Sequence, residues 1–267
     1  MRSVLIALAL LLSFCTSASA GPGSVIVGKI TAVAGKSSVI HLDKSHVPAK
    51  VDASVYQGDV IETSKTGAVN IQFTDNTMFA VSENARLSVD QFAYDASKDS
   101  GRSIFSMLRG VFVYTSGLIG KKDPSKVRIE TPVASLGIRG TVIAGHINPK
   151  GHESQITLLD GAITVTNGSG TEDMNSEFDT VSITSYNDQP KDLGEMDPDK
   201  FVDAYHSLTT VAFDTLDNFV DIGDTPEKGQ DHQGGTERPD VPDTFERPEI
   251  PEPPPETPNL EIGPHGQ

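Results

Sequence analysis

Apolar and polar side chains alternate along most of the first two thirds of the chain. Val69, Ile71 and Phe73 are separated by single polar residues, which is the two-residue period of a strand with one buried face. The same alternation recurs at Leu87 and Val89, Val127 and Ile129, Ile163 and Val165, and Val181 and Ile183. Turn-forming residues separate these segments, at Gly58-Asp59, Thr66-Gly67, Asp75-Asn76, Glu83-Asn84 and Asp160-Gly161. The pattern predicts an all-β domain over residues 24–184, with many short strands forming a sandwich or a β-solenoid-like domain.

A helical pattern follows this domain. Asp197 precedes Pro198, which suits an N-cap followed by proline at the first helical position. Apolar residues then recur at spacings of three and four, at Phe201, Tyr205, Leu208, Ala212, Leu216 and Phe219. We therefore expect one amphipathic helix over residues 197–221, with its apolar stripe either docked on the β-domain or presented to a partner. Docking is favoured, because amphipathic helices usually serve their own core.

The two ends of the chain have other compositions. Arg2, the apolar run Val4–Leu12 and the small residues ending at Ala20 form a secretory signal peptide over residues 1–20. The last 46 residues hold ten of the 17 prolines and eleven acidic residues against three basic ones. Such a segment cannot offset the entropy of folding, so residues 222–267 are predicted to be a disordered, acidic, Pro-rich tail.

These features predict an exported protein, periplasmic or secreted, with no transmembrane segment after signal cleavage. Cys15 lies within the signal peptide and is the chain's single cysteine, so the mature protein would contain none. It would enter an oxidising compartment and rely on an ordinary apolar core instead of disulfides.

The formal net charge of −16 argues against nucleic-acid binding. No Gly-x-Ser-x-Gly elbow is present and no mature cysteine could act as a nucleophile. The histidines form no pair at metal-ligand spacing. We therefore predict no catalytic residues, no metal and no cofactor. The aromatic residues mostly alternate to face a core, so a sugar-stacking surface is disfavoured.

One segment stands out chemically, the run from Thr131 to Thr141. It places Arg139 among glycines, with Gly137 two residues before it and Gly140 directly after it. Glycines at such positions indicate a backbone that something approaches closely, or torsions that other residues avoid. An arginine in these surroundings is either paired within the fold or presented to a ligand.

The β-domain resembles the FecR domain family over roughly residues 25–166. The motifs that carry the resemblance are Thr131–Thr141 with its Gly-Ile-Arg-Gly-Thr core, Gln57–Thr63, Gly67–Val69, Phe73–Thr77, Glu83–Leu87, Leu108–Phe112 and Leu159–Ile163. The resemblance implies a β-rich extracytoplasmic module, best known from sensors that relay a signal from an outer-membrane receptor to a sigma factor. It does not extend to the helical cytoplasmic domain of those sensors, and it brings no catalytic residues.

The candidate partner-binding residues are Arg139, Gly137, Gly140 and Thr141. For Arg139 we favour a structural role, with its guanidinium buried or half-buried and tied to carbonyls or to a carboxylate, for which Glu130 and Asp160 are the candidates. The predicted function is that of a non-catalytic interaction module, with an envelope or secreted protein as partner, in envelope signalling or surface assembly. The alternatives are a carbohydrate-binding surface protein and an enzyme that acts on polysaccharide.

Overall fold

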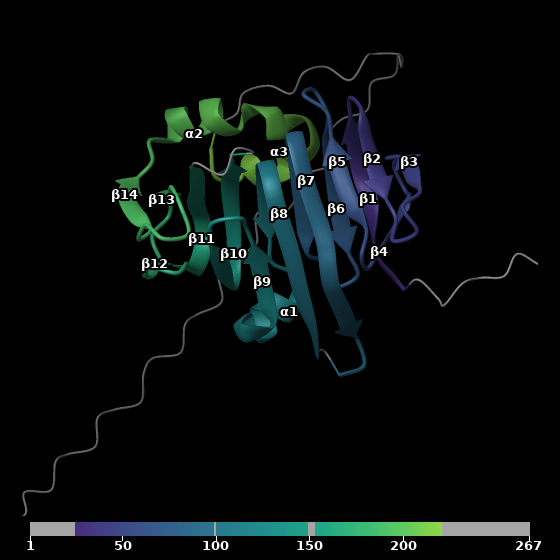
Figure 1. The fold of residues 1–267 in the computed structure, drawn as a ribbon, viewed down its shortest axis with the longest axis horizontal. Helices are drawn as coiled ribbons and strands as arrows, with labels where there is room; N and C mark the ends of the chain where they lie inside the picture. Colours follow the sequence, from purple (N-terminus) through teal and green to yellow (C-terminus); the bar gives the residue numbers. More distant parts are fainter. Residues whose placement is uncertain (1–24, 99, 149–152, 221–267) are drawn as a thin grey trace, which may run out of the picture. The chain divides into compact units, whose positions relative to one another are not determined.

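The computed structural model describes residues 25–98, 100–148 and 153–220. The predicted signal peptide and the predicted tail lie outside these residues. Fourteen strands of the described chain form one sheet (Figure 1). They are β1 (Ile26–Ala34), β2 (Ser37–Ile40), β3 (His46–Pro48), β4 (Ser54–Tyr56), β5 (Val60–Thr63), β6 (Ala68–Phe73), β7 (Met78–Asp95), β8 (Ser100–Thr115), β9 (Val127–Glu130), β10 (Ser135–Ile147), β11 (Ser154–Thr166), β12 (Thr171–Met174), β13 (Asp179–Ile183) and β14 (Lys191–Glu195). The all-β prediction is confirmed.

The long strands double back on themselves. Phe105 and Tyr114 both belong to β8, yet their ring centroids lie only 6.2 Å apart. In a straight strand, nine residues would separate them by about 30 Å. The strand therefore bends sharply between these two residues, and its two halves face each other.

This bending turns one sheet into two layers. The first layer contains β1, β6, the start of β7, the end of β8 and the end of β10, followed by the start of β11 and β13. The second layer contains β2, β5, the end of β7, the start of β8, β9 and the start of β10, followed by the end of β11 and β12. The arrangement is the sandwich alternative, and the strands form no β-solenoid.

The main apolar core lies between the two layers. Six aromatic residues from both layers form its centre, with neighbouring ring centroids 5.0–6.3 Å apart: Phe73, Phe79, Phe92, Phe105, Phe112 and Tyr114. All six are at most 3% exposed. Their interpretation as core residues, predicted from their alternation, is therefore correct.

A helical layer covers the other face of the first layer. It consists of α2 (Pro198–Tyr205), a 3-10 turn η2 (His206–Leu208) and α3 (Thr209–Leu216). Small residues such as Ala80 and Ala144 point toward it and let the helices approach, and Phe201, Tyr205 and Leu208 fill the second core. The apolar stripe therefore docks on the chain's own sheet.

Polar contacts also join the helical layer to the sheet. The Asn70 amide donates to the Val211 carbonyl at 3.0 Å, beside a break in helical geometry at Ala212. Ser82 and Ser207 hydroxyls lie 2.8 Å apart. The single helix expected over 197–221 is thus interrupted twice within the described residues, at η2 and at Ala212.

Three further elements were not predicted. They are a short helix α1 (Leu118–Lys122), a 3-10 turn η1 (Pro124–Lys126) and strand β14, which lies beyond residue 184. None of the helices in the described residues is long and apolar enough to span a membrane.

Candidate functional site

The Gly-Ile-Arg-Gly-Thr motif forms the bend of β10. Arg139 pairs with Ala162 and Val142 pairs with Asp160, so two residues of β10 oppose one residue of β11 at this point. Gly140 has a φ of +60° and Gly161 has a φ of +85°. Before the bend β10 pairs with β9, and after it β10 pairs with β8. The motif is therefore a β-bulge that carries the strand from one layer to the other.

Strands β7 and β8 bend at the opposite end of the sandwich. Glu83 and Asn84 in β7 and Gly110 in β8 all have positive φ. Gly110 pairs with Ile147, at the end of β10 away from its bend. A methyl group at Gly110 would lie 2.4 Å from the Cα of Ala85, so the two bent strands touch there. Four of the sequence motifs therefore mark strand bends, because bends require glycines and positive φ. They are Glu83–Leu87, Leu108–Phe112, Thr131–Thr141 and Leu159–Ile163.

A cluster of charges closes this second bend. Glu62 accepts hydrogen bonds from Arg86 and, at 3.3 Å, from Arg109. Arg109 also donates to the Asn84 carbonyl at 2.9 Å, and the Ala85 amide donates to the Thr63 hydroxyl at 2.8 Å. These contacts tie β5 to the bends of β7 and β8.

Arg139 is exposed. No hydrogen bond or ion pair joins its guanidinium to any residue that the structure describes. Glu130 lies 3.7 Å from Arg128 instead, and Asp160 is exposed. The prediction that Arg139 is buried or half-buried and tied to carbonyls or to Glu130 or Asp160 is therefore wrong. Alternation itself points Arg139 outward, because Leu136 and Ile138 are buried and the register with β11 is unbroken up to Arg139.

The other three candidate residues differ in exposure. Thr141 is 1% exposed, its amide donates to the Ser116 hydroxyl at 3.0 Å, and its own hydroxyl has no partner among the described residues. Gly137 and Gly140 are half-buried. Thr141 therefore belongs to the packing of the bend, and the surface candidates are Arg139, Gly137 and Gly140.

The glycine at position 137 has no structural requirement of its own. Its φ lies outside the left-handed region, and a methyl group there would meet Thr164 at 3.7 Å, an ordinary contact. The missing side chain leaves room on the outer face of the second layer, beside Arg128, which pairs with Gly137 across the strands.

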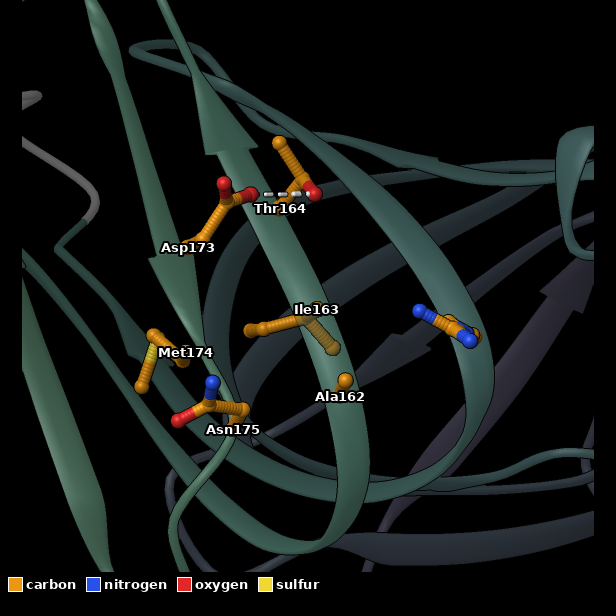
Figure 2. Close-up of a pocket in the computed structure, with 7 residues that line it drawn as sticks. Ala162, Ile163, Thr164, Asp173, Met174 and Asn175 are labelled. Carbon is orange, nitrogen blue, oxygen red and sulfur yellow. Dashed lines mark hydrogen bonds between the residues drawn. The ribbon is translucent and has the colours of Figure 1, made fainter. Parts of the chain in front are cut away.

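A hollow of about 240 Å³ adjoins Arg139. Strand β11 and the segment at β12 form its other walls, through Ala162, Ile163, Thr164, Asp173, Met174 and Asn175. Figure 2 shows Asp173 pointing toward Thr164, whose hydroxyl donates to the carboxylate at 2.7 Å, while Asn175 lies farther along the hollow. The hollow is thus lined by the Arg139 cation, the Asn175 amide and the Asp173 carboxylate, with Ile163 and Met174 as its apolar residues.

A buried carboxylate holds the chain next to this bend. Asp75 is fully buried and accepts hydrogen bonds from the amides of Thr77 at 2.9 Å and Ile119 at 3.2 Å. It thereby fixes the start of α1, which contacts β10. Burial raises the pKa of the neighbouring Tyr114 above its ordinary value. Asp75-Asn76 was expected to form a turn, and its part in anchoring α1 was not predicted.

One His–Asp pair was also missed at the sequence level. His41 Nδ1 lies 2.8 Å from Asp59 Oδ1, and Asp59 additionally accepts from the Tyr56 amide at 2.9 Å. Asp59 is 1% exposed and the His41 ring packs edge-on against Tyr56. The pair fixes the turn before β5. The described residues contain no cluster of three His, Cys, Asp or Glu side chains that could hold a metal.

Comparison with known proteins gives a family match. Residues 59–164 match the family model described as FecR protein. Two structures of a proposed anti-sigma factor from Parabacteroides distasonis ATCC 8503 are 9% and 11% identical, each with a TM-score of 0.41 and 51% of this chain covered. The match spans 59% of those chains. A structure described as a cell surface anchoring domain is 22% identical over 23% of this chain and 82% of its own, with a TM-score of 0.23. No curated protein matches the sequence.

Proposed function

We propose that this chain, whose residues 59–164 match the FecR family model, is an exported, non-catalytic module that binds another envelope or secreted protein. The binding surface in this proposal is the outer face of the second layer around Arg139. The observation that carries it is the exposed guanidinium, which lacks a partner among the described residues and adjoins a hollow of about 240 Å³.

Coverage of the sheet supports this choice of surface. The helical layer of α2 and α3 packs on the first layer. None of the described helices packs in the same way on the outward side of the second layer, where Gly137 and Arg139 lie. A rigid strand presents these residues, and binding residues on rigid elements lose little entropy when a partner docks.

The residues favour a protein partner over the two alternatives. A sugar-stacking surface needs several exposed aromatic rings, but six aromatic side chains of the sandwich are in its core, and Tyr186 is the single aromatic residue among the exposed large hydrophobic side chains of the described residues. For an enzyme acting on polysaccharide, neither the His41–Asp59 pair nor the Arg139 hollow supplies two facing carboxylates.

The cellular setting is part of the proposal. The predicted signal peptide places the protein in the periplasm or outside the cell. A role in envelope signalling agrees with the family of the domain, and surface assembly is the second setting for the same binding event.

The test is recovery of partners from an envelope fraction with three forms of the full chain. Unaltered protein, Arg139→Ala and Gly137→Val would be compared with Lys36→Gln, which removes an exposed cation in the turn before β2. We expect one protein recovered at stoichiometric amounts with the unaltered and Lys36→Gln forms and lost with the other two. Equal recovery with all four forms would contradict the proposed surface. Retention on peptidoglycan or exopolysaccharide without a protein would favour the carbohydrate alternative.

A further inference from the structure

Basic residues concentrate in one stretch of this acidic chain. Residues 100–139 contain seven lysines and arginines and two acidic residues, a net charge of +5, while the whole chain carries −16. The stretch comprises β8, α1, η1, β9 and the start of β10. An opposite local charge on a strongly acidic protein singles out this region electrostatically.

Strand register brings three of these cations to the outer face of the second layer, and a fourth, Lys126, directly precedes β9 at the end of η1. Ile104 pairs with Arg128, and Arg128 pairs with Gly137. Arg102 lies two residues before Ile104, Lys126 two before Arg128, and Arg139 two after Gly137. Because side chains two apart in a strand share a face, Arg102, Arg128 and Arg139 lie on the same face as Gly137, and Lys126 is exposed at the start of β9. We call Arg102, Lys126, Arg128 and Arg139 the basic face.

All four cations are exposed. Arg128 lies 3.7 Å from Glu130, and no carboxylate of the described residues lies within ion-pair distance of the other three. Four carboxylates lie near this face: Glu130, Asp173 at the wall of the hollow, Asp90 of β7, which accepts a hydrogen bond from the Ser106 hydroxyl beside Glu130, and Asp123, whose pKa is lowered by hydrogen bonds from Ser125 and by the charge of Lys126. None of them forms an ion pair with Arg102, Lys126 or Arg139, so these three cations remain available to a ligand.

The spacing suits an extended ligand. Adjacent strands lie about 4.8 Å apart, so the basic face spans about 10 Å across β8, β9 and β10. Alternate carboxylates of an extended peptide are about 7 Å apart. The gap at Gly137 allows such a backbone to approach the sheet closely, and guanidinium groups bind carboxylates through two parallel hydrogen bonds.

We propose that the basic face binds an extended, acidic segment of the partner protein. This inference rests on the proposed function and specifies the chemistry of the partner. The charge contrast adds selectivity, because the rest of this acidic chain repels an acidic ligand that is not aligned with the basic face.

The probe is a fluorescein-labelled acidic peptide with the sequence of residues 243–257, which contains five acidic residues and one arginine. Its matched control replaces the five acidic residues by their amides. Binding to the full chain is followed by fluorescence anisotropy at low and at high salt. A full chain carrying Glu246→Gln, Glu249→Gln, Glu252→Gln and Glu256→Gln is tested in parallel, so that the chain's own acidic residues cannot mask the probe.

We expect the acidic peptide to bind and the amide peptide not to bind, with affinity falling as salt rises. Arg128→Gln with Arg139→Gln weakens binding by about tenfold, whereas Lys36→Gln with Lys65→Gln does not. Gly137→Val also weakens it. Absence of binding to both full chains, or equal loss with the control pair, would overturn the inference.

Two outcomes separate this inference from the proposed function. If heparin or polyphosphate binds the basic face and the acidic peptide does not, the ligand is a polyanion of another class and the inference fails. If the peptide does not bind but Arg139→Ala still abolishes recovery of a stoichiometric envelope protein, the proposed surface stands and only the acidic character of the ligand is wrong.

Discussion

Gly161 lies so close to Gly140 that a methyl group at Gly161 would stand 2.3 Å from the Gly140 carbonyl oxygen. This contact joins the bends of β10 and β11, and it depends on positive φ at both glycines. The Gly-Ile-Arg-Gly-Thr motif therefore has a structural role, because it forms the bend at which β10 passes from one layer to the other. Arg139 lies just before that bend, on the outward face of β10, and is exposed.

Gly161→Ala is expected to destabilise the protein by roughly 2–4 kcal/mol, because it combines backbone strain with a clash. In Gly140→Ala the added methyl group meets no atom within 4 Å. The variant is expected to lose about 1 kcal/mol, because alanine disfavours the left-handed backbone conformation that glycine adopts there. Gly137→Ala is the control, with a change within about 0.5 kcal/mol. Urea unfolding measures all three. Equal losses at the three positions would contradict this account of the bend.

Thr141→Val is expected to stabilise the protein by about 1 kcal/mol. The Thr141 hydroxyl is buried and lacks a hydrogen-bond partner among the described residues, so removing it avoids a desolvation cost while keeping the shape. The Thr141 amide keeps its bond to Ser116. Thermal unfolding of the variant checks this, and a lower melting temperature would show that the hydroxyl is satisfied in solution.

Much of the fold could be predicted from the sequence. The alternation around Val69 predicted the strands, and the apolar stripe from Phe201 predicted the helical segment. Both succeed because strands and helices bury side chains at regular spacings along the sequence. The doubling back of β8 could not be predicted, because Gly110 signals a bend without specifying its angle or the partner strand. Arg139 was placed wrongly for another reason: its pairing was inferred from an arginine beside glycines, whereas alternation with the buried Leu136 and Ile138 points it outward.

The helical layer should depend on Asn70. Asn70→Ala removes the amide that binds the Val211 carbonyl at 3.0 Å and leaves that carbonyl without its partner, a cost of about 1–3 kcal/mol. We expect faster amide exchange in α2 and α3 with little change in the strands of the second layer. Hydrogen exchange followed by mass spectrometry tests this, and uniform acceleration along the chain would mean that the helices do not form a separate unit of stability.

Stability should decline above pH 10. Burial raises the pKa of Tyr205 to about 12 and also raises that of Tyr114, from an ordinary value of 10.0. The unfolded chain loses these protons first, so the contribution of the two tyrosines to the free energy of unfolding is constant below pH 10 and falls as the pH rises above it. Tyr205→Phe should make the decline shallower between pH 10 and 12. An unchanged slope in urea unfolding would contradict the burial of Tyr205.

The most direct test of the central claim is the stability of Arg139→Ala, measured by urea unfolding and a melting curve beside Gly161→Ala. An exposed guanidinium without a partner among the described residues contributes little to folding. We predict a change within about 0.5 kcal/mol for Arg139→Ala, with a large loss for Gly161→Ala. A loss for Arg139→Ala as large as that for Gly161→Ala would show that Arg139 fastens the fold, and would contradict its assignment as a binding residue.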